Sequence, residues 1–212
     1  MFTDFYNHLK KNALIWILAL IVLCATQGLW LLSGIIGVDT ELFYDTGDQF
    51  YGGWMILARY GLVYLNKLFG GAARSPRVIG IFSLIFLEAA CILCTFLLSE
   101  ITHVKSKAAN LVFSILSVTA PIVSEQIYYI CQSMEITLGF CLIAIVLILV
   151  YEFSKKGKIW CLFVSIPFLV ITFTEYQAFV ALYIVGAAIL LYLDFAFDRE
   201  EKSKKDAVFF GW

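Results

Sequence analysis

The stretch Phe140–Tyr151, FCLIAIVLILVY, contains no charged side chain and lies within the longer apolar run Met134–Phe153. A helix needs about 20 consecutive apolar residues to cross the hydrocarbon core of a membrane. The whole chain has the same character, since 62% of its 212 residues are hydrophobic and only 15% are charged. A soluble domain typically carries about 25% charged residues. The sequence therefore predicts an all-α, polytopic membrane helix bundle.

Further apolar runs on both sides of this stretch extend the prediction to about six membrane spans. The shorter runs contain Pro121 and Pro167, which neighbouring helices can accommodate in a membrane. Together the spans are expected to form one transmembrane domain over residues 1–212. The predicted spans are Ala13–Ser33, Val78–Leu98, Ala108–Ser124, Met134–Phe153, Ile159–Thr174 and Gln177–Phe197.

The basic residues orient these spans. Eleven of the fifteen Lys and Arg residues fall on one side when the spans are threaded alternately. The positive-inside rule places that side, with both termini, in the cytoplasm. The other four basic residues lie together in the first outer loop, over residues 34–77. The formal net charge of −1 gives no basic field for binding nucleic acid.

Four acids gather early in this outer loop: Asp39, Glu41, Asp45 and Asp48. A carboxylate at the membrane boundary is a candidate general base, and partial burial beside other acids raises its pKa toward a useful range. Alternatively, the acids hold a divalent cation such as Mg²⁺ or Mn²⁺, for which Asp45 and Asp48 are the candidate ligands. A solvated acidic loop without either role is the remaining alternative.

The second half of the loop has helical periodicity. Leu57, Gly61, Tyr64, Leu65 and Leu68 cluster on one side of a helical wheel, with Trp54 nearby and Arg59 and Asn66 opposite. This pattern predicts an amphipathic helix in the membrane interface, with Arg59 facing water or a cavity. Gly52-Gly53 and Gly70-Gly71 are its expected breaks. The helix is either a simple anchor or part of a lipid-phosphate site built from Arg59 with Arg74 or Arg77.

Three further acids lie close to or within the predicted spans. Glu88 lies in the middle of the second span, where it is expected to be protonated, to pair with Gln27 or Thr95, or to face a cavity. Glu125 is placed to join the outer site. Glu135 is assigned a structural role near a helix N-terminus.

Several short motifs resemble the bacterial glucosyltransferase (Gtr) family of the GT-C superfamily. The first is Gly37-Val-Asp39-Thr-Glu41, which follows the first span. The second is Trp54-Met-Ile-Leu-Ala-Arg59-Tyr60-Gly61, and the third is Thr174-Glu175-Tyr176-Gln177-Ala178 in a later outer loop. The family normally has more helices than this chain offers, so the resemblance suggests the N-terminal part of a longer GT-C enzyme.

The resemblance implies a chemistry. A sugar, expected to be glucose, would move from a polyprenyl-phosphate carrier to a cell-surface glycan such as O-antigen, or to a lipid acceptor, outside the bacterial inner membrane. Asp39 is the first candidate for the base and Glu41 the second. Arg59 would engage the carrier phosphate, and Trp54 belongs to the same motif. Glu175, Tyr176 and Gln177 would line the sugar or acceptor pocket.

Two other classes of function remain open from the residues alone. One is a transporter or flippase for a lipid-linked or polar substrate, for which inverted repeats and broken helices at the midplane are expected. The other is a non-catalytic membrane subunit whose acidic loop binds a partner. The polar residues gather at the outer face rather than at the midplane, which favours the enzyme.

Overall fold

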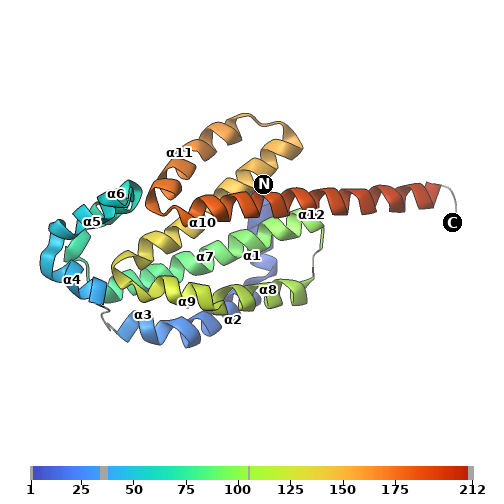
Figure 1. The fold of residues 1–212 in the computed structure, drawn as a ribbon. Coiled ribbons are helices and arrows are strands. Elements are labelled where there is room, and N and C mark those ends of the chain that lie inside the picture. The colour runs from blue at the N-terminus through green and yellow to red at the C-terminus, as the bar shows by residue number, and fades with distance from the viewer. Residues whose placement is uncertain (1, 34–37, 105, 210–212) are drawn as a thin grey trace.

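The computed structural model describes residues 2–33, 38–104 and 106–209, with side chains described for all of these except 33, 38, 39, 48, 72, 122, 126 and 198–209. Within these ranges the chain forms helices and turns and no strand, which confirms the predicted all-α class. Figure 1 shows long helices side by side, with a group of short helices at one end of the bundle. The elements are α1 (Phe2–Lys11), α2 (Ala13–Leu23), the π-helix η1 (Cys24–Gly28), α3 (Leu29–Ser33), α4 (Val38–Thr46), the 3₁₀-helix η2 (Gly47–Phe50), α5 (Tyr51–Ile56), α6 (Tyr60–Leu68), the 3₁₀-helix η3 (Gly71–Ala73), α7 (Pro76–Thr102), α8 (Lys107–Thr119), α9 (Pro121–Tyr128), α10 (Ile130–Lys156), α11 (Trp160–Glu175) and α12 (Ala178–Phe209).

Four helical segments in the described part of the chain are long and apolar enough to cross a membrane. They are Ala13–Leu32, which combines α2, η1 and most of α3, together with Pro76–Thr102, Ile130–Lys156 and Ala178–Phe197. The helices α8 and α11 are apolar but shorter. The protein is therefore a multi-pass membrane protein. Four of the six predicted spans are thus long enough in the described structure to cross a membrane.

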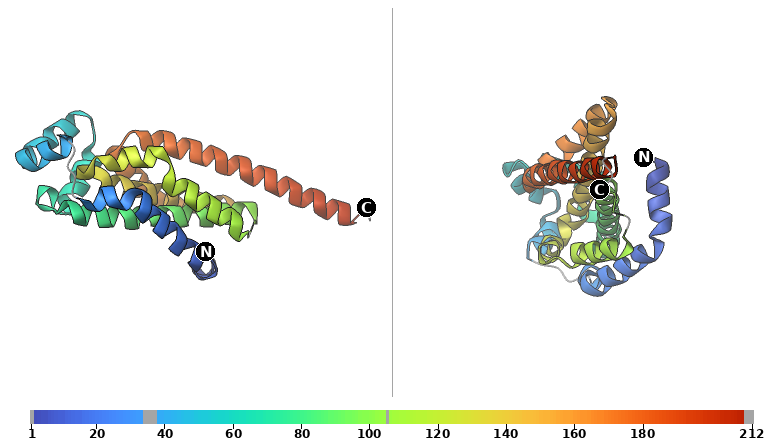
Figure 2. Two further views of the ribbon diagram at one scale, coloured as in Figure 1. Left: turned by 90° about the horizontal axis from the view of Figure 1, so that it is seen from below. Right: turned by 90° about the vertical axis from the view of Figure 1, so that its right-hand side faces the viewer.

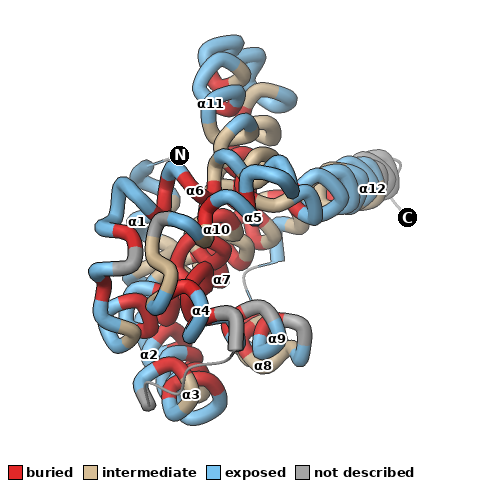
Figure 3. The backbone as a smooth tube through the Cα atoms, turned by 60° about the vertical axis from the view of Figure 1, so that its left-hand side comes forward, coloured by how far each residue is buried: buried red, intermediate tan, exposed pale blue. Residues whose placement is uncertain are grey.

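The core lies between α7 and α10, where Figure 3 shows the densest burial. Phe96, Leu97 and Ile101 of α7 pack against Ile143 and Leu147 of α10. The helix α10 is central because it packs against α7, α9, α11 and α12 and has buried residues along most of its length. A second cluster joins α2, α3, α7, α8 and α9.

Proline divides the predicted third span. The helix α8 ends at Thr119, Ala120 is extended with φ −59° and ψ 128°, and α9 begins at Pro121. Proline disfavours the helical conformation in the residue that precedes it, and it fits well at the first position of a helix. Pro167, by contrast, lies inside α11 without ending it.

Glu88 is buried in α7, and neither of its carboxylate oxygens has a hydrogen-bond partner among the described residues. The expected pairing with Gln27 or Thr95 is wrong. Gln27 Nε2 donates instead to Ser124 Oγ at 2.7 Å, and the Thr95 hydroxyl donates to the Cys91 carbonyl at 2.7 Å. Both candidate partners are thus engaged with nearer groups.

The outer loop folds into the short helices α4, η2, α5, α6 and η3 (Figure 1). The continuous amphipathic helix predicted here is interrupted, because α5 ends at Ile56 and Ala58 adopts φ 56° before α6 begins. Gly52 and Gly53 lie inside α5, so the predicted break at this pair is wrong. The expected break at Gly70 is present, with φ 106°.

The turn at Ala58 changes which residues of α6 are buried. Leu57, Tyr64 and Leu68 are exposed as a group, whereas Leu65 is buried and does not belong to that face. Asn66, on the predicted polar side, is also fully buried. The turn rotates α6 so that one side packs on α10 and α11, an arrangement that the helical wheel of a single helix did not predict.

Candidate active site

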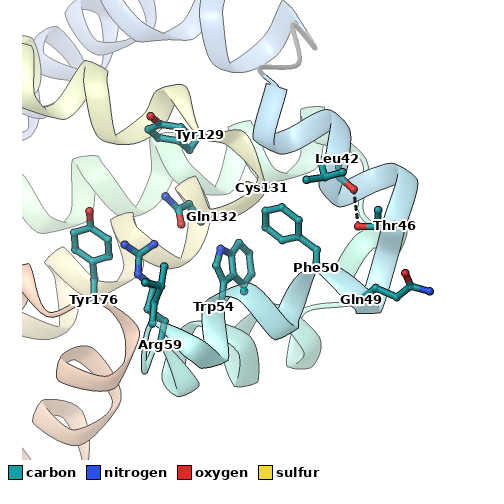
Figure 4. A pocket seen from close by; sticks show the side chains of 12 residues that line it. Leu42, Thr46, Gln49, Phe50, Trp54, Arg59, Tyr129, Cys131, Gln132 and Tyr176 are labelled. Atoms are coloured by element: carbon teal, nitrogen blue, oxygen red, sulfur yellow. Dashed lines mark hydrogen bonds between the residues drawn. The ribbon is translucent and has the colours of Figure 1, made fainter.

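A pocket of about 730 Å³ lies at the end of the bundle that carries the outer loop. Figure 4 shows that side chains from α4, α5, the start of α10 and the turn after α11 surround it. Pockets for small ligands usually have volumes of about 300–1,000 Å³. The lining residues are Leu42, Thr46, Gln49, Phe50, Gly53, Trp54, Leu57, Arg59, Tyr129, Cys131, Gln132 and Tyr176.

Aromatic rings form one wall of the pocket. Trp54 stacks on Phe43 at 5.7 Å between ring centroids and meets Phe50 edge-on at 5.3 Å. Tyr51 adds a further contact to Phe43 at 5.8 Å. Such aromatic pairs are stabilising beyond the burial of their surface. The cluster holds the folded loop rigid and fixes the side of the pocket formed by Phe50 and Trp54.

Arg59 lies at the opposite edge of the pocket, where its guanidinium carbon is 4.4 Å from the centroid of the Tyr176 ring. This is a cation–π contact. The Nε atom of Arg59 is buried and has no hydrogen-bond partner among the described residues. Nearby, Gln177 Nε2 donates to the Leu57 carbonyl at 2.6 Å. The motif containing Arg59 and the motif containing Tyr176 therefore meet at one place in the fold.

Gly61 makes this meeting possible. A Cβ atom at this position would lie 2.6 Å from the Ile171 carbonyl oxygen and 2.8 Å from the Glu175 amide nitrogen. Both are backbone atoms of α11, which cannot move aside without displacing the helix. Only glycine lets the first turn of α6 approach the last turn of α11 this closely.

A buried ion pair fastens the loop behind the pocket. Arg74 Nη2 lies 2.8 Å from Oε1 of Glu135, which is fully buried. Asn66 Nδ2 donates to the same oxygen at 3.1 Å and to the Cys131 carbonyl at 3.0 Å. The Tyr51 hydroxyl in turn donates to Asn66 Oδ1 at 2.8 Å. These contacts join α5, α6 and the residue after η3 to α10.

The structure corrects the role assigned to Glu135. The residue is the sixth of α10 and holds Arg74, so it acts through a tertiary ion pair rather than as an acid near a helix N-terminus. Arg74 is occupied by this pair and is not among the residues that line the pocket. Arg77 is exposed and also lies outside the lining. Of the three arginines proposed to bind phosphate, the structure places Arg59 in the pocket.

Glu175 is fully buried beside the pocket, and neither carboxyl oxygen has a hydrogen-bond partner among the described residues. A Cβ atom at Gly139 would lie 2.9 Å from Oε2 of Glu175, so this glycine gives the carboxyl group its space. Burial raises the pKa of Glu175 well above its ordinary range, and the negative charge of Glu135 raises that pKa further. The site therefore favours the protonated form of Glu175.

The acidic residues of the loop lie on α4 and η2. Leu42 and Thr46 of α4 line the pocket, and Glu41 and Asp45 are exposed. The side chains of Asp39 and Asp48 lie outside the described residues. In the described part of the chain, no three His, Cys, Asp or Glu side chains are grouped closely enough to hold a metal ion.

Some pocket residues were not anticipated. Tyr129 lines the pocket, whereas the neighbouring Tyr128 stacks on Trp30 with 5.0 Å between ring centroids. Gln49 and Gln132 also line it, and no pattern in the sequence distinguished them. Glu125 is exposed and is not among the lining residues.

A comparison with protein families adds independent information. The model of the family described as "Glucosyl transferase GtrII" matches residues 28–211, a range that includes every part of the pocket. No curated protein and no solved structure matches the chain. Since the family match extends over far more than half of the chain, the protein belongs to the glucosyl transferase GtrII family, whose activity is the transfer of glucose.

Proposed function

We propose that the protein transfers glucose from a polyprenyl-phosphate carrier to a cell-surface glycan or lipid acceptor on the outer face of the inner membrane, as a GT-C-type enzyme. The observation that carries the proposal is the position of Arg59 in the pocket. It is a cationic side chain in cation–π contact with Tyr176, and its buried Nε has no hydrogen-bond partner among the described residues. A phosphate is the group that such an arginine recognises best.

The contact with Tyr176 positions Arg59 for an anion. The guanidinium carbon lies 4.4 Å from the centroid of the ring, and the buried Nε has no hydrogen-bond partner among the described residues. We expect the N–H groups that the ring does not cover to donate to phosphate oxygens. The attachment of Gln177 to Leu57 fixes the two chain segments that carry Arg59 and Tyr176.

The rest of the pocket suits a sugar. The rings of Trp54, Phe50 and Tyr129 offer apolar faces for the carbon–hydrogen surface of a pyranose, and the amides of Gln49 and Gln132 offer hydrogen bonds for its hydroxyl groups. Glu175 is buried next to Tyr176, at the edge of the pocket that carries Arg59. The pocket thus combines a site for phosphate with a site for a saccharide.

The base proposed for the reaction is Asp39, with Glu41 as the second candidate. Asp39 lies on α4 one turn before Leu42, which lines the pocket. The hydroxyl oxygen of the acceptor attacks the anomeric carbon, and the bond from that carbon to the phosphate oxygen breaks. The carrier phosphate leaves with the electron pair, Arg59 compensates its charge, and the carboxylate takes the proton of the hydroxyl group. A cation such as Mg²⁺ or Mn²⁺ at Asp45 and Asp48 stays a prediction, and no step above depends on it.

The proposed topology gives the site access to a lipid-linked donor. The unit formed by α8 and α9 and the shorter helix α11 would complete the six spans, with the N-terminus in the cytoplasm and the pocket outside. In that arrangement α6 lies in the outer interface and turns the exposed Tyr64 and Leu68 toward lipid. The distribution of Lys and Arg supports this orientation.

The test is sugar transfer by the intact protein in vesicles, with polyprenyl-phosphate glucose as donor and isolated cell-surface glycan as acceptor. We expect Asp39→Asn to lower kcat by about 10²–10⁴, as the loss of a general base does. Arg59→Gln should raise KM for the donor. Lys67→Gln is the matched control, because Lys67 lies exposed on α6 and outside the pocket lining. Transfer within a few-fold of the parent in both Asp39→Asn and Arg59→Gln would overturn the proposal.

A further inference from the structure

The helix α1, Phe2–Lys11, has no part in the proposed chemistry, and its orientation differs from that of the other long helices. Both views of Figure 2 show it running across the direction of the spans rather than along them. Asn12 separates it from the span that starts at Ala13. The Asn12 side chain donates to the His8 carbonyl at 3.0 Å and so ties the end of α1 to this bend.

Ring contacts determine which side of α1 faces the bundle. Phe5 lies edge-on to Phe96 of α7 with 5.2 Å between ring centroids, and His8 lies 5.6 Å from the same ring. His8 also contacts Trp16 of α2 at 5.5 Å. Burial, with a smaller effect from Lys11, lowers the pKa of His8, which keeps the ring uncharged at neutral pH. These contacts place the side of α1 that carries Phe5 and His8 against the bundle.

The sides of α1 that do not carry these ring contacts differ from each other, since one is aromatic and exposed and the other is polar. Phe2 is 81% exposed and Tyr6 is 63% exposed, and their spacing of four residues places them on one side of the helix. Asn7 and Lys11 lie on a different side, where they line a small polar pocket. At about 100° per residue, the side of Phe2 and Tyr6 is opposite that of Lys11, and the ring contacts lie between them.

We propose that α1 rests on the lipid surface of the membrane face that carries the N-terminus, with Phe2 and Tyr6 inserted at the boundary of headgroups and acyl chains. The occupant is lipid because the span beginning at Ala13 enters the bilayer directly after α1 and leaves the helix at the level of the headgroups. Lys10 is exposed and lies toward the side of Phe2 and Tyr6, where it favours anionic headgroups. This inference is independent of the proposed glucosyl transfer.

The experiment measures the depth of a fluorescent label on the full chain in vesicles, with the native cysteines replaced. Tyr6→Cys carries the label in one sample and Asn7→Cys in the matched control, since both positions are exposed. We expect lipid-borne quenchers to place the label at position 6 about 5–10 Å inside the headgroup boundary. The label at position 7 should be quenched by aqueous iodide instead. Equal iodide quenching at both positions would overturn the proposal, because position 6 would then face water. A label at position 6 that neither iodide nor the lipid-borne quenchers reach would also overturn it, because protein would then cover this face.

Two lipid compositions test the contribution of charge. Vesicles of phosphatidylcholine alone are compared with vesicles that also contain phosphatidylglycerol, for the labelled parent and for Lys10→Gln. The anionic lipid should increase lipid quenching at position 6, and Lys10→Gln should reduce that increase. An unchanged depth in all samples would overturn the preference for anionic lipid. A label at position 6 that reaches lipid only when phosphatidylglycerol is present would support it.

Discussion

The ion pair between Arg74 and Glu135 offers the sharpest test of how the outer loop is held. Glu135 is fully buried, the Arg74 side chain is 7% exposed, and their nearest atoms are 2.8 Å apart. Glu135→Gln removes the carboxylate and leaves the guanidinium buried with only neutral partners. Removing one member of a buried pair typically costs about 3–5 kcal/mol. Since about 1.4 kcal/mol corresponds to a factor of ten, the unfolding equilibrium should shift by about 10²–10⁴.

The assay is reversible unfolding of the intact protein in mixed micelles, with the free energy of unfolding measured for each variant. The double variant Arg74→Met with Glu135→Leu removes both charges and should lose less stability than either single charge removal, because replacing a buried pair by apolar groups is often neutral. Lys155→Gln is the matched control for an exposed pair, since Lys155 lies 2.7 Å from Asp194 at the surface. Its cost should be at most about 1 kcal/mol. If Glu135→Gln costs no more than this control, or if the losses in the double variant simply add, the ion pair does not hold the loop.

Three more predictions follow from the geometry. Gly61→Ala should lower sugar transfer by displacing α6 from α11, whereas Gly52→Ala, where an added Cβ meets nothing within 4 Å, should leave transfer unchanged; equal activities would contradict the close-approach argument. The folded protein holds the pKa of Glu175 above its unfolded value, so the stability that this residue contributes is present at low pH and is lost as the pH rises toward the folded pKa. Glu175→Gln should therefore unfold at a higher temperature than the parent, by a margin that grows as the pH rises above the ordinary pKa of a glutamate carboxyl. A constant or shrinking margin would show that the fold does not raise the pKa of Glu175. In a background without native cysteines, Asp45→Cys should react with an impermeant thiol reagent before the membrane is opened and Lys10→Cys only afterwards; the reverse order would place the pocket in the cytoplasm.

The sequence alone predicted the class of the fold and the position of its longest helices. A helix in lipid must satisfy its backbone hydrogen bonds internally and must present apolar side chains to the membrane. Runs such as Met134–Phe153 can therefore be recognised from their composition alone. Local rules also anticipated the break at Gly70. The prediction for the region around Pro121 was less complete, because neighbouring helices can tolerate proline in a span, and only the structure shows that α8 stops before it.

Motifs in the sequence also identified Trp54, Arg59 and Tyr176 before the structure placed them around one pocket. A helical wheel predicts which side of a helix is polar, but it does not say what that side will meet. This limit explains why the wheel placed Asn66 on the polar side of the helix but did not predict that Asn66 would be buried against Glu135.

Only the tertiary structure decided which distant groups become partners. The turn at Ala58 redirects α6, Gly61 lets it approach α11, and these two local features bring Arg59 onto Tyr176. Likewise, no rule of spacing connects Arg74 with Glu135, because their contact depends on how α7 and α10 pack and on where the loop folds back between them. Hydrophobicity and backbone preferences act over a few residues and are visible in the sequence, whereas ion pairs and stacked rings depend on distances that exist only after the helices have packed.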